Sequence, residues 1–237
     1  GMKQIRSVMI TGASLLMILS AVLTVMFIKE RAISDAEMLF VSSTTWYAPL
    51  NIAYTVGVDG ISVVMLILSS VIVFTGVFSS WNMNMAKEYF LWYCLLSVGV
   101  FGFFISVDLF TMFLFYEVAL IPMYLLIGLW GTGKKEYSAM KLTLMLMAGS
   151  AFLMIGIIGI YYASGHTTMN LLEIAQLSIP IEYQRWLCPA TFLGFGVLGA
   201  LFPFHTWSPD GHASAPTAVS MLHAGVLMKL GGYGCFR

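Results

Sequence analysis

Two ionisable residues stand inside long apolar stretches, where a charged group is costly. Glu117 lies within a residue or two of the midpoint of 109–130, and Lys229 lies deep inside 213–235, too far from either end to reach water easily. A medium of low dielectric favours the neutral form of both side chains, so each can take up and release a proton. Residues of this kind in this setting point to proton transfer through a membrane.

Pro122 adds a backbone feature beside Glu117. A proline inside a helix cannot donate a hydrogen bond to the carbonyl four residues earlier, here that of Val118. The free carbonyl gives water a place next to the carboxyl group. The alternative is a protonated Glu117 that only forms a hydrogen bond to a neighbouring helix.

Two lysines each have two interpretations. Lys229 is either an onward proton carrier or a fixed counter-ion for an acid on another helix. Lys141 opens the apolar stretch 142–163, so its amine either extends to the membrane surface or takes a place on a proton path. Both are candidate site residues.

Three histidines are candidate proton relays. His205 and His212 lie in 202–212, a segment broken by prolines and a glycine, and broken helices at membrane depth occur where backbone lines a cavity. A polar loop at the membrane surface is an equally good interpretation of His212. His223 shares the last apolar stretch with Lys229 and is placed more deeply, so it is the better relay. The histidine spacing matches no metal site.

The elements that must position these residues are membrane helices. The 237 residues are 59% hydrophobic and 9% charged, whereas roughly a quarter of the residues in a soluble domain are charged. The net charge is zero, so nothing attracts nucleic acid. The sequence has no cysteine cluster and no dinucleotide-binding glycine pattern. It therefore offers no nicotinamide, flavin, iron–sulfur or quinone site, and any redox chemistry belongs to partners.

A membrane span needs about 20 mostly apolar residues. The sequence therefore predicts an all-α, polytopic transmembrane helical bundle that forms a single membrane domain over 1–237. The expected spans are 8–28, 60–79, 89–107, 109–130, 142–163, 187–204 and 213–235.

Short connections add detail to this bundle. The spans 89–107 and 109–130 have almost no loop between them, which predicts a tight helical hairpin. Asp59 and Asp108 precede spans and are expected to cap the helices that follow.

Positive charge near the span ends favours a cytoplasmic amino end. The cytoplasmic side then receives Lys3, Arg6, Lys87, Lys134, Lys135 and Lys141. The long connection 29–59 lies on the opposite side, where Trp46 and Tyr47 are expected at the membrane surface.

Three motifs together resemble the antiporter-like subunits of respiratory complex I. The first, DLFTMFLFYEVALIPMY, runs from Asp108 through Glu117. The second, HTWSPDGHASAPT from His205, is followed by GVLMKLGGYG around Lys229 and looks like the subunit M (mitochondrial subunit 4) family. The third, GVDGIS from Gly57, matches the start of that family's third helix. The resemblance covers essentially the whole sequence.

The resemblance implies a fold and a place within it. The family has an inverted-repeat fold of fourteen helices, and this sequence corresponds to the second to the eighth. It is therefore expected to be a fragment without the first helix and the second repeat, and Gly1 before Met2 is either an artificially added residue or part of a longer reading frame.

The resemblance also implies a function, proton translocation coupled to electron transfer from NADH to quinone. Glu117 matches the family's fifth-helix glutamate, Lys229 its eighth-helix lysine, and Lys141 falls near a sixth-helix lysine of some members. NADH, FMN, iron–sulfur clusters and quinone are expected in partner subunits, and neighbouring antiporter-like subunits, protons and lipid as partners of this chain. The expected location is a bacterial inner membrane, or the mitochondrial inner membrane for a eukaryotic chain.

One position departs from the family pattern. The family usually has a lysine seven residues before the histidine matched by His205, and Leu198 stands there. The usual ion-pair partner of Glu117 is therefore missing. Either Lys141 or Lys229 replaces it, or the half-channel works differently, or pumping is lost.

Three functional hypotheses follow. The first is a proton-translocating subunit of NADH:quinone oxidoreductase without a redox site of its own. The second is a subunit of a multi-subunit cation/proton antiporter, whose large chains share these motifs. The third is a structural membrane subunit whose pump has decayed.

Overall fold

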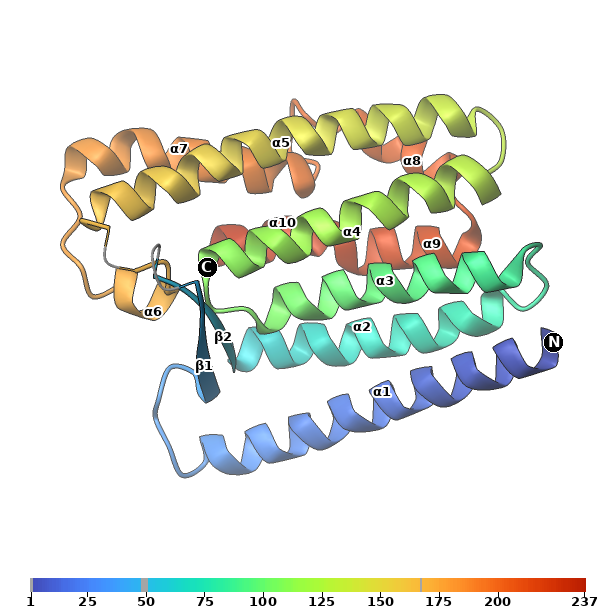
Figure 1. The fold of residues 1–237 in the computed structure, drawn as a ribbon, viewed down its shortest axis with the longest axis horizontal. Coiled ribbons are helices and arrows are strands. Elements are labelled where there is room, and N and C mark those ends of the chain that lie inside the picture. The colour runs from blue at the N-terminus through green and yellow to red at the C-terminus, as the bar shows by residue number, and fades with distance from the viewer. Residues whose placement is uncertain (1, 48–50, 167) are drawn as a thin grey trace.

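The computed structural model describes residues 2–47, 51–166 and 168–237, so Gly1 lies outside the described part. Long helices run along the longest axis of the molecule, and a two-stranded sheet lies near one end (Figure 1). Among the described residues, five helices are long and apolar enough to cross a membrane: α1 (Met2–Arg31), α2 (Gly60–Ser79), α3 (Ala86–Ile105), α4 (Leu109–Trp130) and α5 (Lys135–Ala163).

The second half of the chain has shorter helices. They are α6 (Leu171–Ile174), α7 (Ile181–Leu198), α8 (Trp207–Ser214), α9 (Thr217–Leu222), η2 (His223–Leu227), which is a π-helical turn, and α10 (Met228–Phe236).

Two of the expected spans differ from the structure. In place of 187–204, α7 begins at Ile181 and ends at Leu198. The stretch 213–235 is not one α-helix, because it starts inside α8, breaks before α9 and includes η2. The break falls at Pro216, the N-cap of α9, which has no N–H to continue the helix before it. Neither α7 nor α9 to α10 is among the five apolar spans.

The connection between α1 and α2 contains a β-hairpin that the sequence analysis missed. Strand β1 (Leu39–Tyr47) pairs antiparallel with β2 (Ile52–Val58). Trp46 and Tyr47 are exposed on β1. Threonine, valine and aromatic residues, which favour strands, dominate both segments. The fold is thus a helical bundle with one small sheet.

The turn between α3 and α4 is held from both sides by backbone hydrogen bonds. The Val107 N–H donates to the Thr55 carbonyl of β2 at 2.9 Å, and the Leu171 N–H of α6 donates to the Val107 carbonyl at 3.0 Å. The expected tight helical hairpin is confirmed, since α3 ends at Ile105 and α4 begins at Leu109. Strand β2 and the start of α6 fix the point where α4 enters the bundle.

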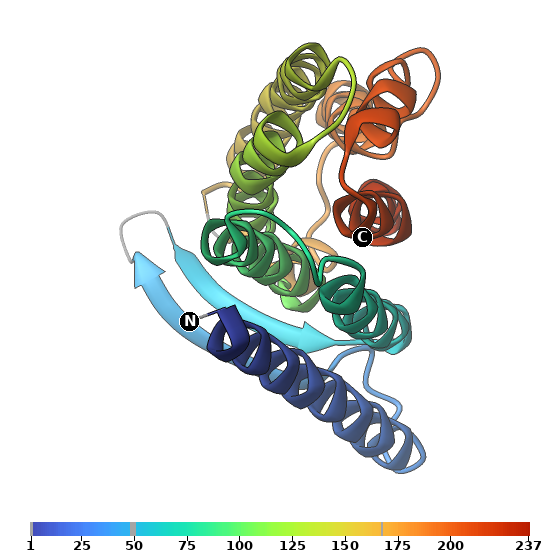
Figure 2. The ribbon, with the colours of Figure 1, turned by 90° about the vertical axis from the view of Figure 1, so that its right-hand side faces the viewer.

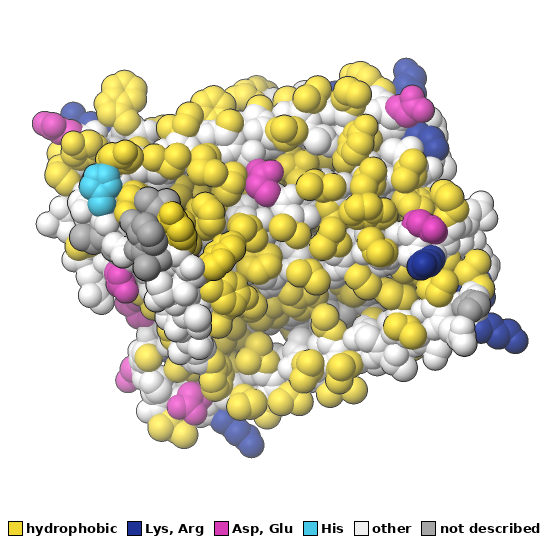
Figure 3. All heavy atoms as spheres, viewed as in Figure 1, with side chains coloured by type: hydrophobic (Ala, Val, Ile, Leu, Met, Phe, Trp, Pro, Cys, Tyr) yellow, Lys and Arg dark blue, Asp and Glu magenta, His cyan; other side chains and the backbone are white. Residues whose placement is uncertain are grey.

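On the face seen in Figure 3, hydrophobic side chains cover most of the bundle, while most of the visible charged groups lie toward its two ends. Seen from the end, α1 lies at one edge, next to α2 (Figure 2). A surface of this kind suits lipid around the middle and water at both ends. The chain is an integral membrane protein, as its composition predicts.

Candidate functional site

Glu117 lies near the middle of α4 and is half-buried. Its Oε1 atom is shielded from solvent and has no hydrogen-bond partner among the described residues. A buried carboxyl oxygen without a partner is costly in the charged state. The structure therefore places an acid in the middle of an apolar span, with one oxygen that makes no hydrogen bond to the described residues.

Pro122 lies in the interior of the same helix and is buried. Since proline has no N–H, the Val118 carbonyl loses its helical donor one residue from Glu117. Backbone gaps of this kind in membrane helices are satisfied by side chains or by water. α4 thus combines an acid with a nearby free acceptor.

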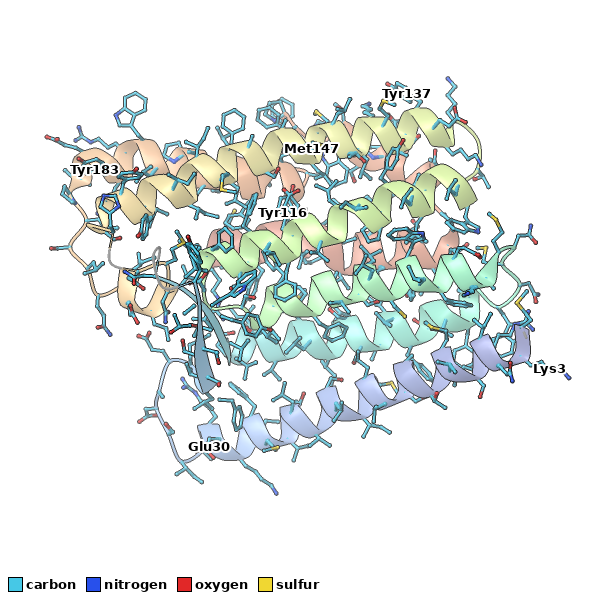
Figure 4. The ribbon with its side chains drawn as sticks, in the orientation of Figure 1. Lys3, Glu30, Tyr116, Tyr137, Met147 and Tyr183 are labelled. Carbon is cyan, nitrogen blue, oxygen red and sulfur yellow. The ribbon has the colours of Figure 1, made fainter. Side chains whose placement is uncertain are left out.

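Leu198, at the end of α7, is 1% exposed. It lines a small cavity of about 10 Å³ together with Tyr116, Trp207 and His223. Tyr116 points from α4 toward α5, where its hydroxyl donates to the Leu146 carbonyl at 2.8 Å (Figure 4). The position where the family resemblance implies a lysine is therefore packed in largely apolar surroundings.

The two lysines proposed as substitutes have other partners. Lys141 donates to Asp210 on α8 at 2.6 Å, and neither side chain is fully buried. Lys229 is exposed and donates to the Ala224 carbonyl one turn back. It borders a cavity of about 300 Å³ whose wall includes Gly231. No ion pair with Glu117 is found among the described residues.

His223 is the most deeply buried of the candidate relays, at 1% exposure. Its ring lies against those of Trp207 and His212, with centroids 5.3 and 4.3 Å away and nearly parallel planes. Neither of its ring nitrogens has a hydrogen-bond partner in the described part of the chain. The structure thus brings His223 and His212 together.

His212 is in turn linked to the end of the bundle core. Its Nδ1 lies 3.3 Å from the Ser220 hydroxyl, and its Nε2 lies 3.4 Å from the Met228 sulfur. Met228 precedes Lys229, so the histidine pair and the lysine share one region. His205 stays apart: it is exposed, and its ring lies near that of Phe202.

Three residues of this region were missed by the sequence analysis. Asp210 lies in the proline-broken segment, and its charge at that place was the signal that could have found it as a partner of Lys141. Trp207 and Tyr116 resemble ordinary core aromatics, and only the fold shows that they share a cavity with His223.

The two acids expected to cap helices do so. Asp59 accepts a hydrogen bond from the Ser62 N–H at 2.8 Å, and Asp108 accepts from two N–H groups at the start of α4. Asp59 also forms an ion pair with Arg237 at 2.8 Å. The second oxygen of Asp108 is buried and has no partner among the residues described.

Metal binding has no support within the described ranges, where no three His, Cys, Asp or Glu residues form a group that could hold an ion. The arrangement instead suits proton exchange, because it places an unpaired acid, a histidine pair and a lysine in or beside apolar helices.

The fold and these residues together define a class of polytopic membrane proteins, the antiporter-like subunits. The model of the NADH:quinone oxidoreductase/Mrp antiporter transmembrane family matches residues 106–237. The chain belongs to this family.

Individual relatives support the assignment. NAD(P)H-quinone oxidoreductase chain 4 2 of Trichodesmium erythraeum is 34% identical over 92% of this chain and 39% of its own length. NADH-quinone oxidoreductase subunit M of Rickettsia prowazekii is 35% identical over 95% of this chain and 46% of its own length. The chain therefore spans less than half of these relatives.

A solved structure shows the same fold. A chain of respiratory complex I from Thermus thermophilus with bound NADH superposes with a TM-score of 0.85 at 23% identity, over 98% of this chain and 48% of that chain. The fold class expected from the sequence, an antiporter-like helical bundle, is confirmed.

Proposed function

We propose that this chain belongs to a proton-translocating membrane subunit of an NADH:quinone oxidoreductase and forms one proton half-channel. The observation that carries the proposal is Glu117, an acid in the middle of α4 whose buried oxygen has no partner among the described residues. An acid in this setting is a functional group by default, because a structural role would leave its desolvation uncompensated. The assignment to an NADH:quinone oxidoreductase rests on the names of the relatives.

In this proposal Glu117 takes up and releases the translocated proton. His223 and His212 relay it through water, because their stacked rings lie 4.3 Å apart and the described residues give the nitrogens of His223 no hydrogen-bond partner. Lys229 is the onward carrier, at the cavity of about 300 Å³ that it borders. Leu198 removes direct control of Glu117 by a neighbouring cation, so the charge of Glu117 responds mainly to water and to neighbouring subunits.

The subunit itself carries out no redox step in this proposal. NADH, FMN, iron–sulfur clusters and quinone are bound by partner subunits, and the other antiporter-like subunits are its neighbours in the membrane. Lys3 and Tyr137 mark the same end of the bundle in Figure 4. We infer that this end, which includes Lys134 and Lys135, faces the cytoplasm of a bacterial cell.

The function is tested in membranes of a strain that lacks the gene, complemented with the full-length chain. We expect NADH-driven, quinone-dependent proton translocation to be lost in the null strain and restored by the wild-type chain. The family also includes Mrp antiporters, so sodium and potassium efflux is measured in parallel. Loss of cation efflux with NADH-driven translocation unchanged would contradict the proposal and favour an antiporter.

A further inference from the structure

The helix α8 closes over His223. It has eight residues and is separated from α7 and α9 by breaks at both ends. Two of its side chains, Trp207 and His212, lie in parallel contact with the ring of His223. α8 therefore supplies much of the cover that leaves His223 almost completely buried.

Gly211 brings the backbone of α8 close to both neighbours. A Cβ atom at this position would lie 2.9 Å from Leu142 Cδ1 of α5 and 3.4 Å from His223 Cε1. The space between α5 and His223 is thus filled by the backbone of α8 itself. A movement of α8 away from α5 would uncover the ring of His223.

Two polar contacts hold α8 against α5. One is the Lys141–Asp210 ion pair at 2.6 Å, and the other is a hydrogen bond from the Ser214 hydroxyl to the Ser138 hydroxyl at 2.7 Å. The Asp210 side chain is 42% exposed and that of Lys141 25%, so water reaches the ion pair. A hydrated ion pair opens and closes at low cost, whereas opening a buried pair strands a charge.

We propose that Asp210 is a positioning residue whose ion pair with Lys141 holds α8 closed over His223. Breaking the pair opens His223 to water at the end of the bundle where α5 begins. The inference rests on the proposed function, because it supplies the entry step of that proton path. It also gives Lys141 a role that requires no contact with Glu117.

The test uses the full-length chain in its complex and compares Asp210→Asn with the exchanged pair Lys141→Asp and Asp210→Lys. Lys135→Gln is the control, since Lys135 donates to the Leu129 carbonyl and has no ion pair in the described part of the chain. Amide hydrogen exchange is measured over 207–214. We expect Asp210→Asn to raise the exchange rate roughly 1.5- to five-fold, the factor that corresponds to a partly exposed ion pair. The exchanged pair should restore slow exchange, and the control should leave it unchanged.

Unchanged exchange in Asp210→Asn would overturn the role of the ion pair, whatever the complex transports. Proton translocation is then measured on the same preparations, where Asp210→Asn should alter its rate and the exchanged pair should recover it. Faster exchange with unaltered translocation would overturn the opening step but leave the proposed function standing. A wild-type complex that translocates no protons would count against the proposed function instead, and the exchange rates would still decide on the ion pair.

Discussion

At the scale of single residues, Glu117 and Leu198 belong together. Glu117 keeps an oxygen without a partner among the described residues, and Leu198 stands where the resemblance to the family implies a lysine that would pair with it. The unpaired acid was predictable from one glutamate in one apolar stretch. Its surroundings were not, because the sequence shows neither that Tyr116 faces Leu198 nor that Lys141 is held by Asp210.

Asp108 is a second acid with a buried oxygen that has no hydrogen-bond partner among the described residues. Its pKa is raised from 3.8 to about 6. Burial is the largest cause, two backbone hydrogen bonds partly oppose it, and the negative charge of Glu173 adds to it. Because the pKa in the folded protein lies above the ordinary value, the stabilising effect of protonation is complete below about pH 4 and is lost as the pH rises through about 6. Asparagine caps a helix as well as aspartate does but cannot ionise.

We therefore expect Asp108→Asn to be more stable than the wild type at about pH 8, by on the order of 2 kcal/mol, and close to it at about pH 4. Thermal unfolding of the detergent-solubilised protein at both pH values measures this. Asp108→Ala serves as the control, because it cannot ionise either and lacks the cap, so it should be about 1 kcal/mol less stable than Asp108→Asn at both pH values. An advantage of Asp108→Asn that does not change with pH would contradict the assignment.

At the scale of elements, the sequence predicted the long helices well and the irregular ones poorly. Runs of apolar residues fixed α2 and α4 because a span must be long and continuous. The hairpin β1–β2 was missed because its strands have only 9 and 7 residues, whereas the sequence was searched for apolar runs long enough to cross a membrane. The stretch 213–235 was predicted as one span because the mean hydropathy of a run of this length does not register the helix break at Pro216.

The packing of α3 against α4 depends on a glycine. A Cβ atom at Gly99 would lie 2.9 Å from the Ala119 N atom and 3.0 Å from the Phe115 carbonyl oxygen, both backbone atoms that cannot move aside. Gly128 of α4 is a matched control, because a Cβ atom there would meet only the Ala139 Cβ at 3.9 Å.

We expect Gly99→Ala to lower the stability by about 1–3 kcal/mol through overpacking. Gly128→Ala should be neutral or stabilising by up to about 1 kcal/mol, since alanine favours a helix more than glycine does. Unfolding midpoints in detergent measure both. Equal midpoints for the two variants would show that α3 and α4 do not approach as closely as described.

At the scale of the whole molecule, the chain spans less than half of the length of the relatives that it matches. It covers 39% and 46% of the two relatives, and Lys229 reaches a cavity on its outer surface. The sequence predicted the family from its motifs, and the family model over 106–237 confirms it, whereas the cavity beside Lys229 is visible only in the fold.

The central claim is that Glu117 carries a proton during turnover. Its most direct test is the number of protons translocated per electron by the assembled complex in proteoliposomes, with NADH and quinone supplied. Glu117→Gln should lower this ratio while the amount of assembled complex stays the same, and Glu136→Gln, at an exposed acid in the first turn of α5, should leave the ratio unaltered. An unchanged ratio in Glu117→Gln would contradict the account and favour a structural subunit that no longer pumps.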